Sequence, residues 1–167
     1  RAFQVSSIFP KMTVGENVRS AVHAQQRQSL NMLSRASRVG AAQTQLALSL
    51  CGLEAKRDLV AGELAQGDKK RLELAIALAG KPRLLFLDEP TAGMSVDEAR
   101  STMELVGRLN RELKLTVLFT EHDMSIVFNH ARKLTLLHRG EIVVTGSPDE
   151  VRANATAQKV YLGEHAL

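Results

Sequence analysis

Apolar residues recur through the first half of the chain with the spacing of helices that bury one face. Thr13 and Glu16 form a capping box, which marks the start of the first helix. Gly52 and Gly80 stand where two further helical patterns stop, as glycine commonly does at a helix end. The helices predicted in this half span about residues 13–37, 40–51 and 69–79.

The pattern changes after residue 80. Residues 84–87 (LLFL) and 115–120 (LTVLFT) are continuous apolar runs, which predict strands covered on both faces. The other elements expected here are helices over 95–112 and 123–130, strands over 133–138 and 141–146, and a final helix from Ser147. Strands that alternate with helices predict a parallel α/β sheet. We therefore expect a helical subdomain at about 1–66 and a sheet subdomain at about 67–167.

Local signals fix several of these boundaries. Ser95 and Glu98 form a second capping box, and Asp123 is expected to cap the short helix that follows it. Arg139-Gly140 between two apolar runs indicates a β-hairpin. Pro148 stands at the first position of the final helix, where its missing N–H costs nothing.

Composition is that of a soluble globular protein of ordinary domain size, with 167 residues, 44% hydrophobic and 24% charged. No apolar run approaches the ~20 residues that cross a bilayer, and the first residues do not resemble a signal peptide. The single cysteine, Cys51, excludes an internal disulfide framework and fits a reducing cytoplasm. Its apolar neighbours predict a buried, inert thiol.

The net charge of +4 is unevenly distributed. The first 80 residues carry 11 Lys and Arg against 6 Asp and Glu, so nucleic acid is one conceivable partner of this half. However, its arginines at positions 19, 27, 35 and 38 are spaced along a helix without interleaved aromatic residues. A solvated or partner-facing helix explains them better, and no nucleic acid is expected.

Three titratable residues follow the two central strands. Asp88 and Glu89 come directly after the first, and His122 comes just after the second. Ligands of parallel α/β sheets bind beyond the carboxyl ends of the strands, so we expect all three at one rim. An aspartate in this place can hold Mg²⁺ on nucleotide phosphates, and the neighbouring glutamate can activate a water. An apolar run followed by two acids is also common in ordinary acidic turns.

A set of ordered motifs favours the nucleotide interpretation. LAQGDKKRLELAIALA, LLFLDEPTAG and LFTEHD follow one another at the spacing found in the ATP-binding subunits of ABC transporters, which the chain resembles over nearly its whole length. The resemblance implies a P-loop NTPase-like fold with a helical subdomain, and ATP and Mg²⁺ as cofactors. It implies that Gln4 senses Mg²⁺, Asp88 holds the ion, Glu89 is the catalytic base and His122 contacts the γ-phosphate. Ser95 falls in the loop called the D-loop.

The signature motif of the family corresponds to Leu64, Ala65, Gln66, Gly67 and Asp68. These residues begin a helix, whose free N–H groups and dipole attract phosphate oxygens, and Gly67 lets a ligand approach closely. The resemblance implies that a second subunit pairs head to tail, so that each signature closes on the other's nucleotide. The commonest signature is LSGGQ. Ala65 therefore lacks a hydroxyl, Asp68 adds a negative charge or caps the helix, and Ser95 replaces the usual aspartate.

A phosphate-binding P-loop, G-x-x-x-x-G-K-[ST], is not among these residues. Gly80-Lys81 precedes a proline and a strand, so it does not fit that motif. Relatives place the P-loop upstream of the position of Gln4. We therefore expect roughly the first third of such a domain, with its Walker A region, to lie outside this segment, and the segment alone to be inactive.

The resemblance extends to a subgroup. FQVSSIFPKMTVGENV and YLGEH are similar to importers of branched-chain amino acids and related amides. This implies transmembrane permease partners and a place on the cytoplasmic face of the membrane. Two alternatives stay open: a non-catalytic interaction module with a degenerate site, and a soluble ABC-type ATPase of DNA repair, for which no coiled-coil insertion is visible.

Overall fold

The computed structural model describes residues 8–25 and 36–162 of the chain. It forms two compact units, one within residues 1–120 and one within residues 121–167, and each unit is described by itself. This grouping does not test the predicted functional division after residue 66, which stays a prediction.

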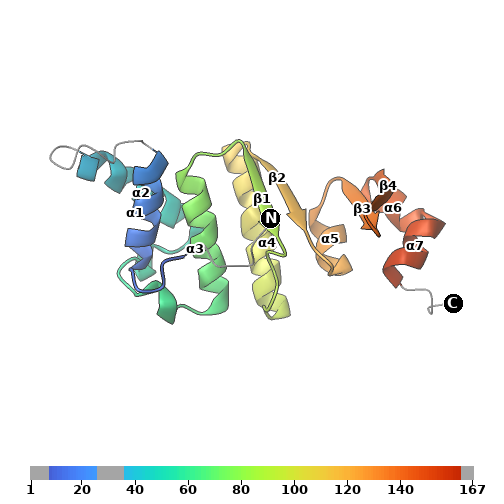
Figure 1. Cartoon of the computed structure of the whole chain (residues 1–167), viewed down its shortest axis with the longest axis horizontal. Coiled ribbons are helices and arrows are strands. Elements are labelled where there is room, and N and C mark those ends of the chain that lie inside the picture. Colours follow the sequence, from blue (N-terminus) through green and yellow to red (C-terminus); the bar gives the residue numbers. More distant parts are fainter. Residues whose placement is uncertain (1–7, 26–35, 163–167) are drawn as a thin grey trace. The chain divides into compact units, whose positions relative to one another are not determined.

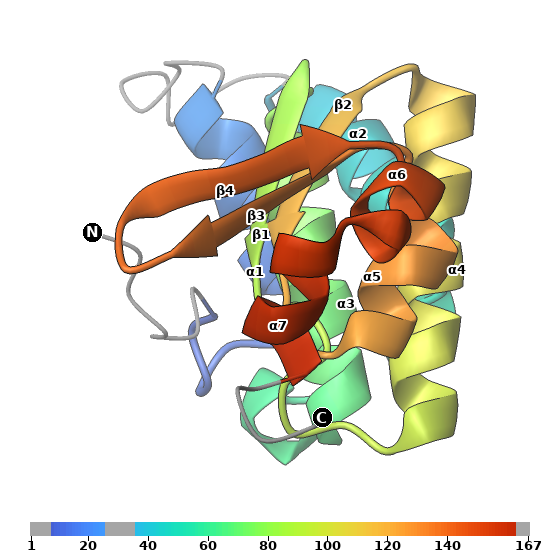
Figure 2. The ribbon, with the colours of Figure 1, turned by 90° about the vertical axis from the view of Figure 1, so that its right-hand side faces the viewer.

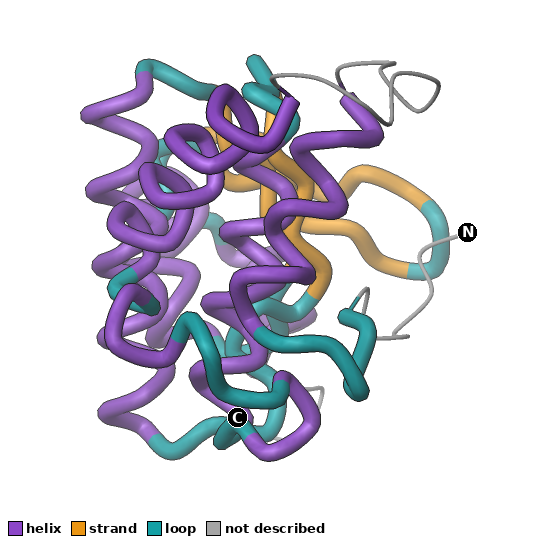
Figure 3. The backbone as a smooth tube through the Cα atoms, turned by 90° about the vertical axis from the view of Figure 1, so that its left-hand side faces the viewer, coloured by secondary structure: helices purple, strands orange, loops and turns teal. Residues whose placement is uncertain are grey.

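The first unit combines a helical layer with a pair of strands (Figure 1). Its elements are α1 (Val14–Gln25), α2 (Ala36–Cys51), two short 3₁₀ turns (Glu54–Lys56 and Ala61–Glu63), α3 (Gln66–Ala79), β1 (Leu84–Asp88), α4 (Val96–Leu113) and β2 (Thr116–Thr120). Viewed from the side of α1 and α2, helical turns form the near layer of this unit (Figure 3).

The start of α1 is as the sequence predicts. The Thr13 amide donates to Glu16 Oε2 over 2.8 Å, and the Glu16 amide donates to Thr13 Oγ1 over 3.1 Å. The predicted continuation of this helix beyond Gln25 falls on residues 26–35, outside the described residues. The predicted interruption between Ser37 and residue 40 is wrong, because α2 runs unbroken from Ala36 to Cys51. The end of α2 is correctly predicted at Gly52, whose φ of +69° suits glycine.

β1 and β2 pair in parallel, with Leu84 opposite Thr116 and Asp88 opposite Thr120. Leu85 points into the core that α4 shares with the helical layer. The prediction of strands covered on both faces is wrong for the described residues, since Phe86 is 65% and Leu118 is 53% exposed. Successive side chains of a strand alternate between faces, and α4 covers only one of them.

An apolar core joins α1–α4 and the two strands of the first unit. Leu48 of α2, Leu72 of α3 and Leu109 of α4 are fully buried in it. Cys51 is buried with them, as predicted, and burial raises the pKa of its thiol to about 12. The thiol is therefore protonated and unreactive at neutral pH.

The second unit is a hairpin packed against short helices (Figure 2). Its elements are α5 (Met124–His130), β3 (Leu134–His138), β4 (Glu141–Gly146), α6 (Pro148–Ala153) and α7 (Ala155–Leu162). Arg139 and Gly140 both have positive φ, 49° and 84°, as a two-residue hairpin turn of the predicted kind requires. The single final helix that was predicted is two helices, because Asn154 adopts an extended conformation and its side chain caps α7.

We predict that burial governs stability in α2 and that apolarity alone does not. Leu48→Ala should lower the free energy of unfolding by about 2–5 kcal/mol, because it removes a fully buried side chain and leaves a cavity. Leu46→Ala, two residues away, should cost less than about 1 kcal/mol because Leu46 is 57% exposed. Urea denaturation of both variants measures the difference. Equal losses would show that the core is not where the structure places it.

Candidate functional site

The carboxyl ends of β1 and β2 carry a hydrogen-bonded cluster around Asp88 and Thr120. Thr120 Oγ1 donates to Asp88 Oδ1 over 2.5 Å. The same hydroxyl accepts from the Glu89 amide over 3.3 Å, and that amide also donates to the Thr120 carbonyl over 3.1 Å. One threonine thus fixes the aspartate carboxylate and the backbone of the next residue.

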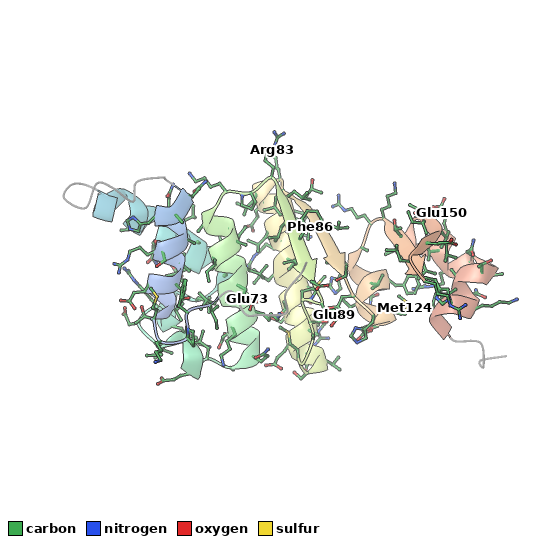
Figure 4. The ribbon with its side chains drawn as sticks, viewed as in Figure 1. Glu73, Arg83, Phe86, Glu89, Met124 and Glu150 are labelled. Carbon is green, nitrogen blue, oxygen red and sulfur yellow. The ribbon has the colours of Figure 1, made fainter. Side chains whose placement is uncertain are left out.

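Glu89 adopts a left-handed backbone conformation with φ of +43°. This conformation costs an ordinary L-residue about 1–2 kcal/mol, and the following Pro90 restricts the residue further. Figure 4 places Glu89 and Arg83 at opposite ends of β1, so Glu89 lies at the rim where the strands end. Backbone strain persists where the surrounding structure enforces it, and it is concentrated at functional sites.

The loop from Glu89 to Ser95 folds back on itself before α4 begins. The Ala92 amide donates to the Glu89 carbonyl over 3.1 Å, and Gly93 takes a φ of +76°. Ser95 caps α4 in the predicted capping box: its Oγ accepts from the Glu98 amide, and its own amide donates to Glu98 Oε2 over 3.0 Å. The structure therefore gives the Ser95 hydroxyl a structural role in addition to its predicted place in a binding loop.

The predicted signature residues stand at the start of α3. Ala65 is the N-cap residue and makes no side-chain hydrogen bond to the helix, so no side chain of its own seals this helix end. Gln66 and Gly67 begin the first turn. Leu64 differs from the others, because its side chain is only 6% exposed and packs into the core.

Asp68 does not cap α3, which corrects one of the two roles considered for it. It lies inside the first turn and forms an ion pair with Lys56. The Lys56 ammonium offsets its negative charge. Asp68 therefore opposes the approach of an anion less than its charge alone predicts.

The strand ends and the starts of α3 and α4 lie at the same end of the first unit (Figure 1). α3 and α4 run opposite to β1 and β2, so the residues after Asp88, the capped start of α4 and the open start of α3 share this end. It therefore combines a fixed carboxylate with a helix N-terminus, the two features that the predicted chemistry needs.

His122 lies near the start of the second unit, two residues beyond Thr120 along the chain. It is exposed there, and Asp123 beside it caps α5. Hydrogen bonds from Ser125 hold the pKa of Asp123 below its usual value, and His122 acts in the same direction. Gln4, the remaining predicted site residue, lies outside the described residues.

The chemistry of the strand end fits a magnesium ion held mainly by other oxygens. Asp88 offers a hard carboxylate at a fixed position, and Mg²⁺ commonly takes one or two carboxylates with waters and phosphate oxygens. No group of three or more His, Cys, Asp or Glu side chains that could hold a metal by itself occurs within residues 8–25 and 36–162. Such a site suits a metal that arrives with a phosphate ligand.

Thr120 is the site residue that the sequence pattern did not single out. Its signal was available in principle, because two parallel strands of equal length, each ending in a polar residue, place those residues opposite each other. The choice of threonine as the partner of Asp88 depends on strand register, which a single sequence does not specify.

Comparison with known proteins decides the family. The family model described as ABC transporter matches residues 1–92. The chain belongs to the ABC transporter family. The high-affinity branched-chain amino acid transport ATP-binding protein LivG of Salmonella typhimurium is 33% identical over 98% of this chain and 67% of its own length. BraF of Pseudomonas aeruginosa, of the same description, is 32% identical over the same shares.

Solved ABC structures share the fold. cbiO1 from Clostridium perfringens, part of the transporter complex cbiONQ, aligns with a TM-score of 0.74 and 28% identity. The alignment covers 91% of this chain and 58% of cbiO1. The ATP-binding cassette MJ1267 aligns with a TM-score of 0.77 and 25% identity over 98% of this chain and 68% of its own. The P-loop NTPase-like fold class predicted from sequence is confirmed, and the chain spans about two thirds or less of these relatives.

The described helices include none with the length and apolarity of a membrane span. The roles of the individual site residues stay predictions, because overall similarity to a family does not assign them.

We predict that Glu89 holds a strained backbone that glycine would relieve. Glu89→Gly should be more stable than Glu89→Ala by about 1 kcal/mol, since both remove the side chain and only glycine adopts positive φ freely. At Ala92, whose φ is not positive, Ala92→Gly should instead lower stability relative to the parent. Denaturant titration of the three variants compares them. If Glu89→Ala were as stable as Glu89→Gly, the strain would not exist.

Proposed function

We propose that this chain is the part of an ABC importer's ATP-binding subunit that hydrolyses the nucleotide and meets the second subunit. One observation carries the proposal: Asp88, fixed by Thr120, and the strained Glu89 share one end of the first unit with the open N-terminus of α3. Each feature alone has an ordinary structural explanation. Their combination, in the motif order of the family, supports nucleotide chemistry.

Asp88 is the residue proposed to hold Mg²⁺. The hydrogen bond from Thr120 uses one acceptor position on Oδ1 of Asp88, and the other carboxylate oxygen, Oδ2, is proposed to bind the ion. When bound, Mg²⁺ would neutralise charge on the phosphate oxygens of ATP. Gln4, placed by the resemblance in the Q-loop, is proposed as a further contact to the ion.

Glu89 is proposed to act as the general base. The left-handed backbone turns the chain away from the line of β1 immediately after Asp88. The two adjacent carboxylates can therefore contact different groups, the metal ion and the attacking water. Asp88 is then free to hold the ion while Glu89 orients and deprotonates the attacking water. His122 is proposed to contact the γ-phosphate, as its motif position implies.

The N-terminus of α3 is proposed to bind the nucleotide of a second copy. Backbone N–H groups at Gln66, Gly67 and Asp68 belong to the first turn, where a helix has no carbonyl partners of its own for them. Leu64 and Ala65 support this turn from the buried and exposed side respectively. Ser95 lies in the adjoining loop, so the same surface of the protein carries both motifs.

The remainder of the site is proposed to come from residues beyond this segment. The P-loop of P-loop NTPases supplies the amide cradle and lysine for the β- and γ-phosphates. The 167 residues contain no such motif, and they span 67% of LivG. ATP hydrolysis is therefore proposed for the longer protein, and not for this segment alone.

Branched-chain amino acids or related solutes are the proposed cargo. LivG and BraF are described as branched-chain amino acid transport proteins, whereas the 34% identical PhnC of Bdellovibrio bacteriovorus is a phosphonates import protein. The choice follows the relatives that align over nearly the whole chain. The proposed assembly pairs two such subunits with transmembrane permeases at the cytoplasmic face of the membrane.

The first expected result concerns the segment alone. Calorimetric titration of the 167-residue chain with Mg-ATP should show no binding in the micromolar range, because the phosphate cradle is missing. Circular dichroism on the same sample controls for folding. Micromolar binding by folded chain would contradict the division of the site that we propose.

A second expected result concerns catalysis in the longer protein that includes the P-loop. Glu89→Gln should lower kcat for ATP by about 10²–10⁴-fold, since a general base commonly contributes that much. Glu112→Gln is the matched control, because Glu112 is exposed near the other end of α4. Steady-state ATPase assays compare the three proteins. Equal turnover of parent and Glu89→Gln would favour the non-catalytic module.

A further inference from the structure

The side chain of Glu98 binds the end of the loop at Ser95 and lies beside the first turn of α3. Its Oε2 accepts from the Ser95 amide over 3.0 Å and from Ser95 Oγ over 2.8 Å. These bonds belong to the capping box of α4 and hold Oε2 of the carboxylate in place. They also lower the pKa of Glu98, so that the side chain is ionised at neutral pH.

The other carboxylate oxygen of Glu98 faces α3. A Cβ placed on Gly67 would lie 3.4 Å from Glu98 Oε1, 3.9 Å from its Cδ and 4.0 Å from its Cγ. The whole end of the Glu98 side chain therefore lies against the backbone of the first turn of α3. These distances are those of ordinary van der Waals contact, so the carboxylate lies beside the helix at position 67.

A second contact continues this line one turn further. Arg71 Nη2 donates to Ser101 Oγ over 2.8 Å. Arg71 follows Gly67 by four residues and Ser101 follows Glu98 by three, so each pair lies on one face of its helix. The starts of α3 and α4 are therefore held side by side, with Glu98 as the contact nearest the helix ends.

Ser95 connects this contact to the loop after Glu89. The loop is closed by the bond from the Ala92 amide to the Glu89 carbonyl and by the bond from the Met94 amide to the Thr91 carbonyl, over 3.2 Å. It ends at Ser95, whose amide and hydroxyl both bind Glu98. A displacement of the loop therefore moves the carboxylate that lies on Gly67.

We propose that Glu98 is a positioning residue that joins the loop Glu89–Ser95 to the first turn of α3. The two surfaces then keep a fixed relation and meet a ligand as one body. This consequence rests on the proposed function, in which both surfaces approach the nucleotide of a second copy. The structural link between the loop and α3 does not depend on the proposed function. Glu98 acts through Ser95 and Gly67 and touches no reacting atom.

Residue-resolved hydrogen exchange on the 167-residue chain, measured without nucleotide, tests whether Glu98 links the loop to the first turn of α3. In Glu98→Ala, the amides of Lys69 and Lys70 in α3 and those of Ala92 and Met94 in the loop should exchange about fivefold faster, the size expected for loss of a cap-like contact. Glu98→Gln should restore most of the protection, because glutamine also completes a capping box and has the same shape.

Two controls separate this result from a general loss of stability. Asp97→Ala removes a neighbouring exposed carboxylate that pairs with Arg100, and it should leave exchange in α3 unchanged. The amide of the fully buried Leu109 reports global opening and should change less than the amides of α3. Faster exchange confined to α4 in Glu98→Ala would show that Glu98 caps only its own helix, and would overturn the proposal.

The longer protein supplies a functional readout. Glu98→Ala should raise KM for ATP severalfold with a smaller change in kcat, because the displaced α3 would weaken the contact to the partner's nucleotide while Glu89 stays in place. Glu98→Gln should behave as the parent. If hydrogen exchange responds as expected and KM does not change, the link between the loop and α3 is supported. The proposed role of α3 in nucleotide binding is then contradicted.

Discussion

The parallel pairing of β1 with β2 is the constraint on which the rest of the site depends. In this register Asp88 lies opposite Thr120, and the threonine hydroxyl binds both the Asp88 carboxylate and the Glu89 amide. If one strand shifted by one residue against the other, its side chains would turn to the opposite face, and Asp88 and Thr120 would no longer lie on the same face of the sheet. The apolar residues of the strand pair hold this register, because Leu85 has to face the core beneath α4.

The direction of the chain then decides what gathers around this pair. α3 precedes β1, α4 connects β1 to β2, and both helices run opposite to the strands, so α3 and α4 begin where β1 and β2 end. The core residues Leu72, Leu109 and Leu85 lock these elements together. A helix N-terminus, a capped helix and a carboxylate pair thus meet through topology alone, before any specific contact is considered. Glu98 adds the specific contact.

The parts that sequence predicted well are those fixed by neighbours along the chain. The capping boxes at Thr13 and Ser95 and the hairpin turn at Arg139 depend on residues three positions apart or fewer, and all are present. The exposed face at Phe86 and Leu118 was wrongly predicted as covered. An apolar run shows that a strand is suited to burial, but not which elements cover it. The contacts of Thr120 and Glu98 join residues about thirty positions apart, and so they required the structure.

Glu89 is the position at which local preference and structure disagree most. The residue before a proline favours an extended backbone, yet Glu89 has a φ of +43°. At Gly52, Gly93 and Gly140 the chain uses glycine for positive φ. Within residues 8–25 and 36–162, the other non-glycine residues with positive φ are Lys81, Lys114 and Arg139. They stand in turns between elements, and none follows a strand that ends in an acid. A glutamate stands here although glycine would adopt this backbone conformation without strain. The proposed role of Glu89 as the general base would account for it, and this is our reason to propose a hydrolytic site over a degenerate one.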